Sequence, residues 1–167
     1  MRFMQVFIAN IDSISKNTDD FVTLLPVGDR ARATKFQKRT RKLQFILGHL
    51  MVANIGKKYT SIAHRDKLVV VATASNARLG VDIENASVKR DFVAASEIMG
   101  ISPPKTLFDF YKMFTKSEAT YKLGTTPACT HFITHGDYLI CVVANKDFAM
   151  PRVHNFDALS ILAAKKE

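Results

Sequence analysis

The sequence predicts an α+β fold that contains two similar halves. One observation is a short internal repeat, here called the sequence echo: residues 62–68 (IAHRDKL) resemble residues 133–139 (ITHGDYL). A strongly apolar run follows each copy. Another is that a stretch with helical periodicity precedes each copy, at residues 39–55 and again at 104–123. A helix followed by a hairpin, repeated once, is the pattern of a duplicated unit.

The duplication is expected to divide the chain into an N-terminal half, residues 1–73, and a C-terminal half, residues 74–167, within one compact unit. A length of 167 residues suits one ordinary domain or two small fused halves, and 47% hydrophobic residues support a core. The net charge of +9 favours an anionic partner, whether nucleic acid, an acidic membrane surface, a phosphorylated small molecule or an acidic protein.

The N-terminal half begins with an apolar strand at residues 3–9 and a polar stretch that ends at Asp20. The most basic segment of the chain, residues 30–42, leads into the first amphipathic helix. Arginines at the opening of a helix suit phosphate, because guanidinium groups pair with phosphate oxygens and helix-start amides add to the attraction. The alternative is a solvated basic face. Gly48 in this helix costs about 1 kcal/mol relative to alanine, which indicates close packing there.

The C-terminal half continues through a strand at residues 79–84, a helix near residues 89–99 and, after the second amphipathic helix, closing strands. Residues 102–104 (SPP) form a helix-start signal for that second helix. Its expected apolar stripe comprises Leu107, Tyr111, Phe114 and Tyr121.

The strand at residues 79–84 carries two carboxylates, Asp82 and Glu84. Because side chains alternate along a strand, both point to one face while Val81 and Ile83 point to the other. Two like charges this close are tolerated in a folded domain when a cation or a proton lies between them. Oxygen ligands suit a hard cation, so magnesium is the first expectation, and the alternative is a solvated edge strand with two surface acids.

A third carboxylate, Glu118, falls within the apolar stripe of the second helix. A carboxylate on a buried helix face needs a partner. Lys122 lies one turn further on, so one interpretation is an ion pair on the helix surface. The other interpretation places Glu118 beside Asp82 and Glu84 as a third metal ligand and directs Lys122 at an anionic substrate.

The two cysteines, Cys129 and Cys141, lie in apolar, strand-like surroundings without metal-ligand spacing, which indicates buried free thiols in a reducing compartment. The apolar run at the N-terminus is too short and interrupted for a signal peptide, and no segment approaches the ~18 apolar residues of a membrane span. We therefore expect a cytoplasmic protein that does not bind a membrane.

Residues 80–84 (GVDIE) and residues 114–122 (FTKSEATYK) together resemble the two signature motifs of the 4'-phosphopantetheinyl transferase superfamily. Those motifs are written (V/I)G(V/I)D(I/V)E and (F/W)(S/T/C)xKE(A/S)xxK. The first matches fully, and the second matches at the aromatic, threonine, glutamate, alanine and final lysine positions. The family has a lysine immediately before the glutamate, whereas this chain has Ser117 there and Lys116 one place earlier.

The resemblance covers roughly residues 30 to 145 and is closest to the Sfp-type subfamily. Residues 36–50 resemble the basic, glycine-containing helix that helps to bind the phosphates of coenzyme A in that subfamily. His64 matches a histidine, preceded by serine in the family, that contacts the 3'-phosphate of coenzyme A. This chain has Ala63 in place of the serine, and it has Arg65 and Asp66 where the family has Ser-Gly, so the hydroxyl contact is lost.

The resemblance implies a 4'-phosphopantetheinyl transferase-like fold, in which two similar α+β halves form a pseudo-twofold duplication with the active site between them. It implies transfer of 4'-phosphopantetheine from coenzyme A to a serine of an apo acyl or peptidyl carrier protein, with release of 3',5'-ADP. The enzyme would be of the holo-acyl-carrier-protein synthase type and monomeric, as compact bacterial relatives generally are. Its acidic carrier partner would be attracted by the +9 charge, and nucleic acid would not be a partner.

The same resemblance implies roles for individual residues. Glu118 would accept the serine proton, directly or through a water, and Lys122 would stabilise the transferring phosphoryl group or the leaving nucleotide. The expected ligands of Mg²⁺ are Asp82, Glu84 and Glu118. The expected contacts of the nucleotide phosphates are Arg32, Arg41, Lys57 and His64.

Two alternatives stay open. Ser117 cannot supply the positive charge of the family lysine, so the chain could be a degenerate relative that binds coenzyme A or a carrier protein without efficient transfer. A basic nucleic-acid-binding domain is the alternative from another class. It predicts an affinity that falls steeply with salt and is indifferent to Asp82→Ala.

Overall fold

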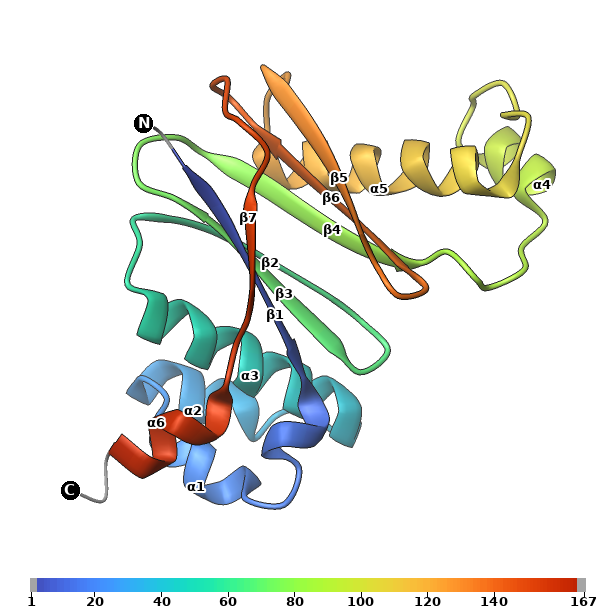
Figure 1. The fold of residues 1–167 in the computed structure, drawn as a ribbon. Helices are drawn as coiled ribbons and strands as arrows, with labels where there is room; N and C mark the ends of the chain where they lie inside the picture. The colour runs from blue at the N-terminus through green and yellow to red at the C-terminus, as the bar shows by residue number, and fades with distance from the viewer. Residues whose placement is uncertain (1–2, 165–167) are drawn as a thin grey trace.

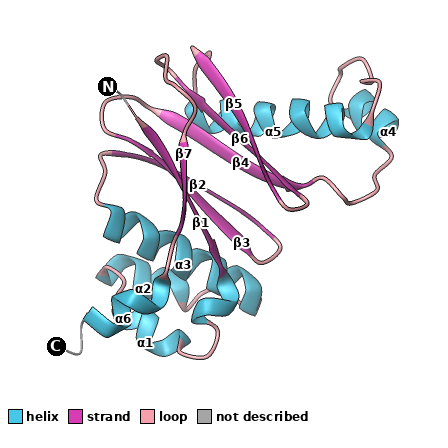
Figure 2. Ribbon diagram, viewed as in Figure 1, coloured by secondary structure: helices cyan, strands magenta, loops and turns pink. Residues whose placement is uncertain are grey.

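Two β-sheets pack face to face in this α+β protein, and helices cover the outer face of each sheet (Figure 1, Figure 2). The computed structural model describes residues 3–164. The four-stranded sheet has the order β2-β3-β1-β7 and the three-stranded sheet the order β4-β6-β5. No helix in residues 3–164 is long and apolar enough to cross a bilayer.

The elements of the N-terminal half come first in the chain. They are β1 (Met4–Asn10), the 3-10 helix η1 (Ile11–Ile14), α1 (Thr18–Thr23), α2 (Val27–Ala33), α3 (Arg39–Ile55), β2 (Tyr59–Arg65) and β3 (Leu68–Ala74). The remaining elements are β4 (Leu79–Asn85), α4 (Phe92–Ile98), α5 (Leu107–Leu123), β5 (Cys129–His135), β6 (Tyr138–Ala144), β7 (Arg152–Asn155) and α6 (Ala158–Ala164).

The long apolar runs of β3 and β6 follow from their central positions. In β3, Val70 and Ala72 face the other sheet while Val69 and Val71 pack under the helices of the N-terminal half. A strand that is buried on both faces has no polar alternation, which is why it is apolar at nearly every position. Cys141 of β6 packs towards α5 in the same way. Cys141 is a fully buried free thiol, as expected. Cys129 is also a free thiol but is only partly buried, which differs from the expectation.

The two halves share one topology. Each contributes a three-strand unit, β2-β3-β1 and β5-β6-β4, and a long helix on its outer face. The hairpin turns correspond as well, because Asp66 and Gly136 each occupy the first turn position with positive φ angles of 50° and 58°. This correspondence is one residue out of step with the sequence echo, so the structural counterpart of His64 is Thr134 and not His135.

The C-terminal segment returns to the first sheet. β7 pairs in parallel with β1, with Gln5 opposite Arg152 and Ile8 opposite Asn155. Ala158 of α6 joins the core formed with α3. The expected C-terminal half, residues 74–167, therefore supplies the strands of the second sheet and also completes the first.

The helix predictions hold with two boundary corrections. The helix at residues 39–55 is confirmed, and a β-carbon added to its Gly48 would lie 3.0 Å from Ile62 Cγ2, which confirms the close packing. α5 begins at Leu107 and not at residue 104, because the Thr106 side chain caps it by accepting a hydrogen bond of 3.1 Å from the Asp109 amide. The helix expected near residues 89–99 is the shorter α4.

Candidate functional site

The candidate site lies where the two halves meet, along β2 of one half and β4 of the other. The amide of Val81 in β4 donates a 3.1 Å hydrogen bond to Ser61 Oγ in β2. Val81 and Ile83 are buried between the sheets, as the alternation predicts. Asp82 and Glu84 lie on the opposite face of β4, which is the face towards α5.

The close seating of α5 on β4 decides which helix residues are buried. A β-carbon on Gly80 would lie 2.0 Å from the carbonyl oxygen of Ala119, so only glycine permits this contact. Small side chains of the helix, Thr115 and Ala119, therefore face the strand and are fully buried. The full set of buried α5 residues is Phe110, Tyr111, Thr115, Ala119 and Leu123.

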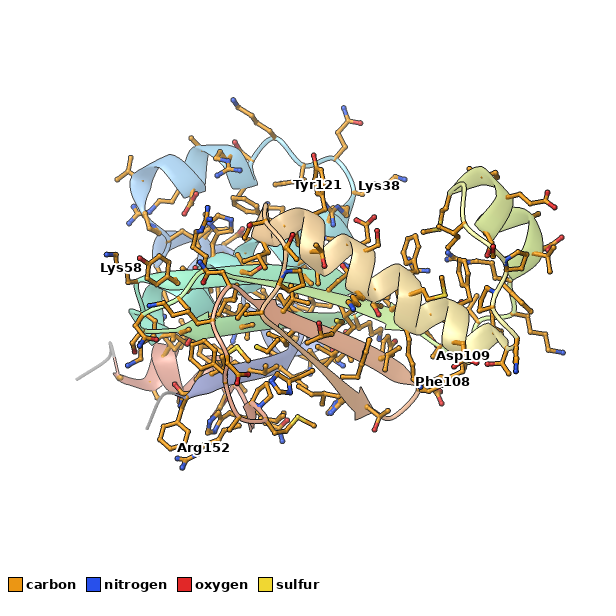
Figure 3. The ribbon with its side chains drawn as sticks, turned by 90° about the horizontal axis from the view of Figure 1, so that it is seen from above. Lys38, Lys58, Phe108, Asp109, Tyr121 and Arg152 are labelled. Atoms are coloured by element: carbon orange, nitrogen blue, oxygen red, sulfur yellow. The ribbon has the colours of Figure 1, made fainter. Side chains whose placement is uncertain are left out.

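The expected stripe of this helix was consequently wrong at its C-terminal end. Tyr121 is 85% exposed and projects from the outer side of α5 (Figure 3). Glu118 is exposed as well and does not belong to the buried stripe. It lies beside the strand face that carries the acid pair, and its charge adds a small rise to the pKa of Asp82, which burial raises most.

Lys122 links α5 to Asp82. Its Nζ donates hydrogen bonds to the Val81 carbonyl oxygen at 2.9 Å and to Asp82 Oδ1 at 3.1 Å. Burial raises the pKa of Asp82, and the neighbouring Lys122 ammonium opposes part of that rise. The interpretation in which Lys122 pairs with Glu118 along the helix surface is therefore not what the structure shows.

Glu84 has a different cationic neighbour. Arg65 Nη1 at the end of β2 lies 3.4 Å from Glu84 Oε2, and the Glu84 side chain is only 10% exposed. Burial raises the pKa of Glu84, and Arg65 opposes the rise most strongly among its neighbours, with a smaller contribution from Arg90. Arg90 is held by aromatic rings, since its Cζ lies 5.6 Å from the ring centroids of both Tyr111 and Phe114.

The acid pair keeps unsatisfied atoms despite these neighbours. Within residues 3–164, four buried side-chain atoms lack a hydrogen-bond partner, and three of them lie here: Asp82 Oδ2, Glu84 Oε2 and Arg65 Nε. A buried polar atom without a partner costs about 1–3 kcal/mol, so such a group of atoms points to a missing ligand.

The oxygen donors present suit a hard cation such as Mg²⁺. No three His, Cys, Asp or Glu side chains in the described part of the chain lie close enough together to hold a metal ion. The structure thus brings Asp82 and Glu84 together and places Glu118 at the margin of the pair.

Across the junction from the acid pair, Arg41 and His64 contact each other. Arg41 Nη1 also donates to Gln44 Oε1 at 3.0 Å, which fixes the guanidinium group on α3. Burial, together with the positive charges of Arg41 and Lys122, lowers the pKa of His64 to about 4. This histidine is therefore neutral at pH 7.

Of the other two expected phosphate contacts, Arg32 lies near the Arg41–His64 pair and Lys57 does not. Arg32 of α2 stacks on Phe45, 5.0 Å from its ring centroid, beside the hollow of about 160 Å³ that Arg41 and His64 also line. Lys57 lies before the opposite end of β2 and lines a separate hollow with Arg152. A strand of this length keeps Lys57 roughly 20 Å from His64, at about 3.3 Å per residue, so the two do not act on one phosphate.

Three basic residues at the ends of β2 and β4 were not predicted from the sequence. Lys58 and Arg78 line a hollow of about 310 Å³ together with Lys122, and Figure 3 shows Lys58 at the end of the molecule away from Phe108 and Asp109. Arg65 is the third. Its position directly after His64, at the end of a strand, was the available signal for it.

A wider hollow of about 690 Å³ lies between η1, α1 and the start of α3. Its lining mixes the acids Asp19 and Asp20 with the bases Arg39 and Lys42, and it contains none of the unsatisfied atoms.

Comparison with known proteins shows no family for this chain, because no protein-family model and no curated protein matches it.

Proposed function

We propose that this protein transfers the 4'-phosphopantetheine group of coenzyme A to a serine of an apo acyl or peptidyl carrier protein. The observation that carries the proposal is the pair of unsatisfied, buried carboxylate oxygens on Asp82 and Glu84. Asp82 accepts a hydrogen bond from Lys122, and Arg41 and His64 contact each other on the neighbouring half. Acidic and basic groups thus converge at the junction between two similar halves, as binding of a metal-bound diphosphate requires.

In this proposal Asp82 and Glu84 are the ligands of Mg²⁺, and Glu118 lies at the margin of the pair. The bound ion would neutralise the charge that develops on the diphosphate as the phosphoanhydride bond breaks. Asp82 can take this role because its hydrogen bond with Lys122 engages only Oδ1 and leaves Oδ2 free.

Glu118 accepts the proton of the acceptor serine. The serine Oγ forms a bond to the β-phosphorus of coenzyme A, the bridging P–O bond breaks, and its electron pair leaves with 3',5'-ADP. The exposure of Glu118 suits this role, because the serine arrives on a separate protein. Lys122 lies one helical turn away and stabilises the transferring phosphoryl group or the leaving nucleotide.

Arg41 and neutral His64 bind the 3'-phosphate. The guanidinium group supplies permanent charge, and the imidazole gains a proton when the phosphate approaches. Arg32 contributes from the edge of the same hollow. The net charge of +9 attracts the acidic carrier.

The test is to mix the protein with coenzyme A, Mg²⁺ and an apo acyl carrier protein and to measure the carrier by intact-mass spectrometry. We expect a gain of one phosphopantetheine group that is lost in Glu118→Ala. Glu97→Ala is the matched control, because Glu97 is also an exposed helical glutamate but lies on α4. Transfer that survives Glu118→Ala would refute the role of Glu118 as the proton acceptor.

A second candidate is a relative that binds coenzyme A without efficient transfer. The observation that favours it is that the exposed position next to Glu118 carries Ser117 and not a lysine, while the Lys122 ammonium group is held by Asp82. Titration calorimetry with coenzyme A and Mg²⁺ distinguishes the two candidates. Binding without mass gain on any of several carriers would favour the second candidate.

A further inference from the structure

Arg65 has no role in the reaction described so far, yet it is held against the acid pair. Its Nη1 lies 3.4 Å from Glu84 Oε2 and its Nε lies 4.0 Å from Asp66 Oδ1. Nε is buried and makes no hydrogen bond, while 34% of the side chain is exposed. The guanidinium group is therefore anchored at the acid pair, reaches solvent, and retains a donor without an acceptor.

The turn that carries Arg65 is fixed to the other half of the molecule. Asp66 Oδ2 accepts hydrogen bonds from Tyr138 Oη at 3.0 Å and from Asn85 Nδ2 at 3.2 Å. Asp66 holds a positive φ of 50° in this arrangement. These bonds join the β2–β3 turn to β4 and β6, so the position of Arg65 relative to Glu84 is set by two strands and does not depend on a flexible loop.

The charges around this point balance in the absence of a ligand. The acids of the site are Asp66, Asp82, Glu84 and Glu118, and the bases are Arg41, Arg65, Arg90 and Lys122. A divalent cation would give this set of groups a net charge of about +2, which attracts an anionic ligand. Arg65 supplies one of the positive charges in this set.

We propose that Arg65 binds the diphosphate bridge of coenzyme A, with its Nη groups directed at phosphate oxygens. The inference rests on the proposed function and adds a substrate-binding residue to it. A guanidinium group suits the task, because it stays charged beside Glu84 and presents several donors in one plane. Arg90, held over Tyr111 and Phe114, adds a second fixed positive charge from the segment after β4.

The first measurement is calorimetric titration of Arg65→Met with coenzyme A in the presence of Mg²⁺. Methionine keeps the apolar stem of the arginine and removes the charge and the donors. We expect the dissociation constant to rise about 10- to 100-fold, as for loss of a charge-assisted hydrogen bond. The matched control is Lys67→Met, which removes one positive charge from the same turn but from a 63% exposed side chain paired with Asp12.

The second measurement replaces coenzyme A by 3'-dephospho-coenzyme A. The loss caused by Arg65→Met should persist with this ligand, because the diphosphate is still present. The loss caused by Arg41→Met should disappear, because its partner is the 3'-phosphate. An Arg65→Met loss that disappears with the dephospho ligand would move Arg65 to the 3'-phosphate and overturn the inference.

The remaining outcomes are also decisive. If Arg65→Met proves unfolded by circular dichroism, Arg65→Lys replaces it, and a loss of about tenfold is expected because the charge stays while the fork is removed. Unchanged affinity in a folded Arg65 variant would refute the inference and leave the proposed function intact. Failure of the wild-type protein to bind either ligand would refute the proposed function and the inference with it.

Discussion

Gly80→Ala tests the contact that positions the helix of the candidate site. The added β-carbon would lie 2.0 Å from Ala119 O and 2.9 Å from the Leu123 amide nitrogen, and both are backbone atoms that cannot rotate away. An ordinary carbon–oxygen contact needs about 3.3 Å, so α5 must move outward by roughly 1 Å. Overpacking of this kind costs about 1–3 kcal/mol, and we expect the upper part of that range. The same displacement lengthens the hydrogen bond between Lys122 and Asp82.

Urea denaturation followed by circular dichroism measures the change. A loss of about 3 kcal/mol corresponds to a melting temperature lower by roughly 6–12 °C for a chain of this size. Gly28→Ala in α2 is the control, because nothing lies within 4 Å of its added β-carbon and the helix gains propensity. If Gly80→Ala unfolds at the wild-type urea concentration, α5 is not seated on β4 as described here.

Two further predictions concern individual side chains of the site. Ser117→Lys adds a positive charge on α5 beside Glu118, and we expect the initial rate of carrier modification to rise about two- to fivefold. The control is Ser75→Lys on the β3–β4 connection. Equal rates in both variants would contradict the placement of residue 117 near the phosphates. The pKa of His64 is lowered from 6.5 to about 4 in the folded protein, so the unfolded chain binds a proton that the folded chain does not between these values. The free energy of unfolding should therefore fall as the pH falls from about 6.5 towards 4. In His64→Gln, the midpoint of urea denaturation should depend less on pH over this range. An unchanged pH dependence in this variant would show that His64 is not buried beside Arg41.

The acid pair and the long helices were predictable because local periodicity decides them. Asp82 and Glu84 share a face through the two-residue period of a strand, and the α3 stripe continues without interruption to Gly56, whose positive φ ends the helix. Sequence alone also indicated a duplication, although the echo at His64 and His135 was one residue out of step. The sequence alignment paired His64 with His135 because two apolar hairpins are similar by chance. The structural alignment is set by the turn geometry, which pairs Asp66 with Gly136.

The exposure of Glu118 was not predictable in the same way. Bulky side chains such as Tyr121 suggested the buried stripe, but the contact with Gly80 selects small residues for that face. That selection depends on a strand distant in sequence. The separation of Lys57 from His64 and the approach of Arg65 to Glu84 likewise depend on how β2 lies beside β4, which no local pattern contains.

The parallel pairing of β7 with β1 has a consequence for how the chain folds during synthesis. β1 leaves the ribosome before the other strands of its sheet, yet one of its two edges stays without hydrogen-bond partners until residues 152–155 have emerged. Nascent chains that stop earlier carry an open, apolar strand edge, which is a template for intermolecular pairing. The first sheet therefore gains its last strand late, and truncations that remove β7 are expected to increase aggregation.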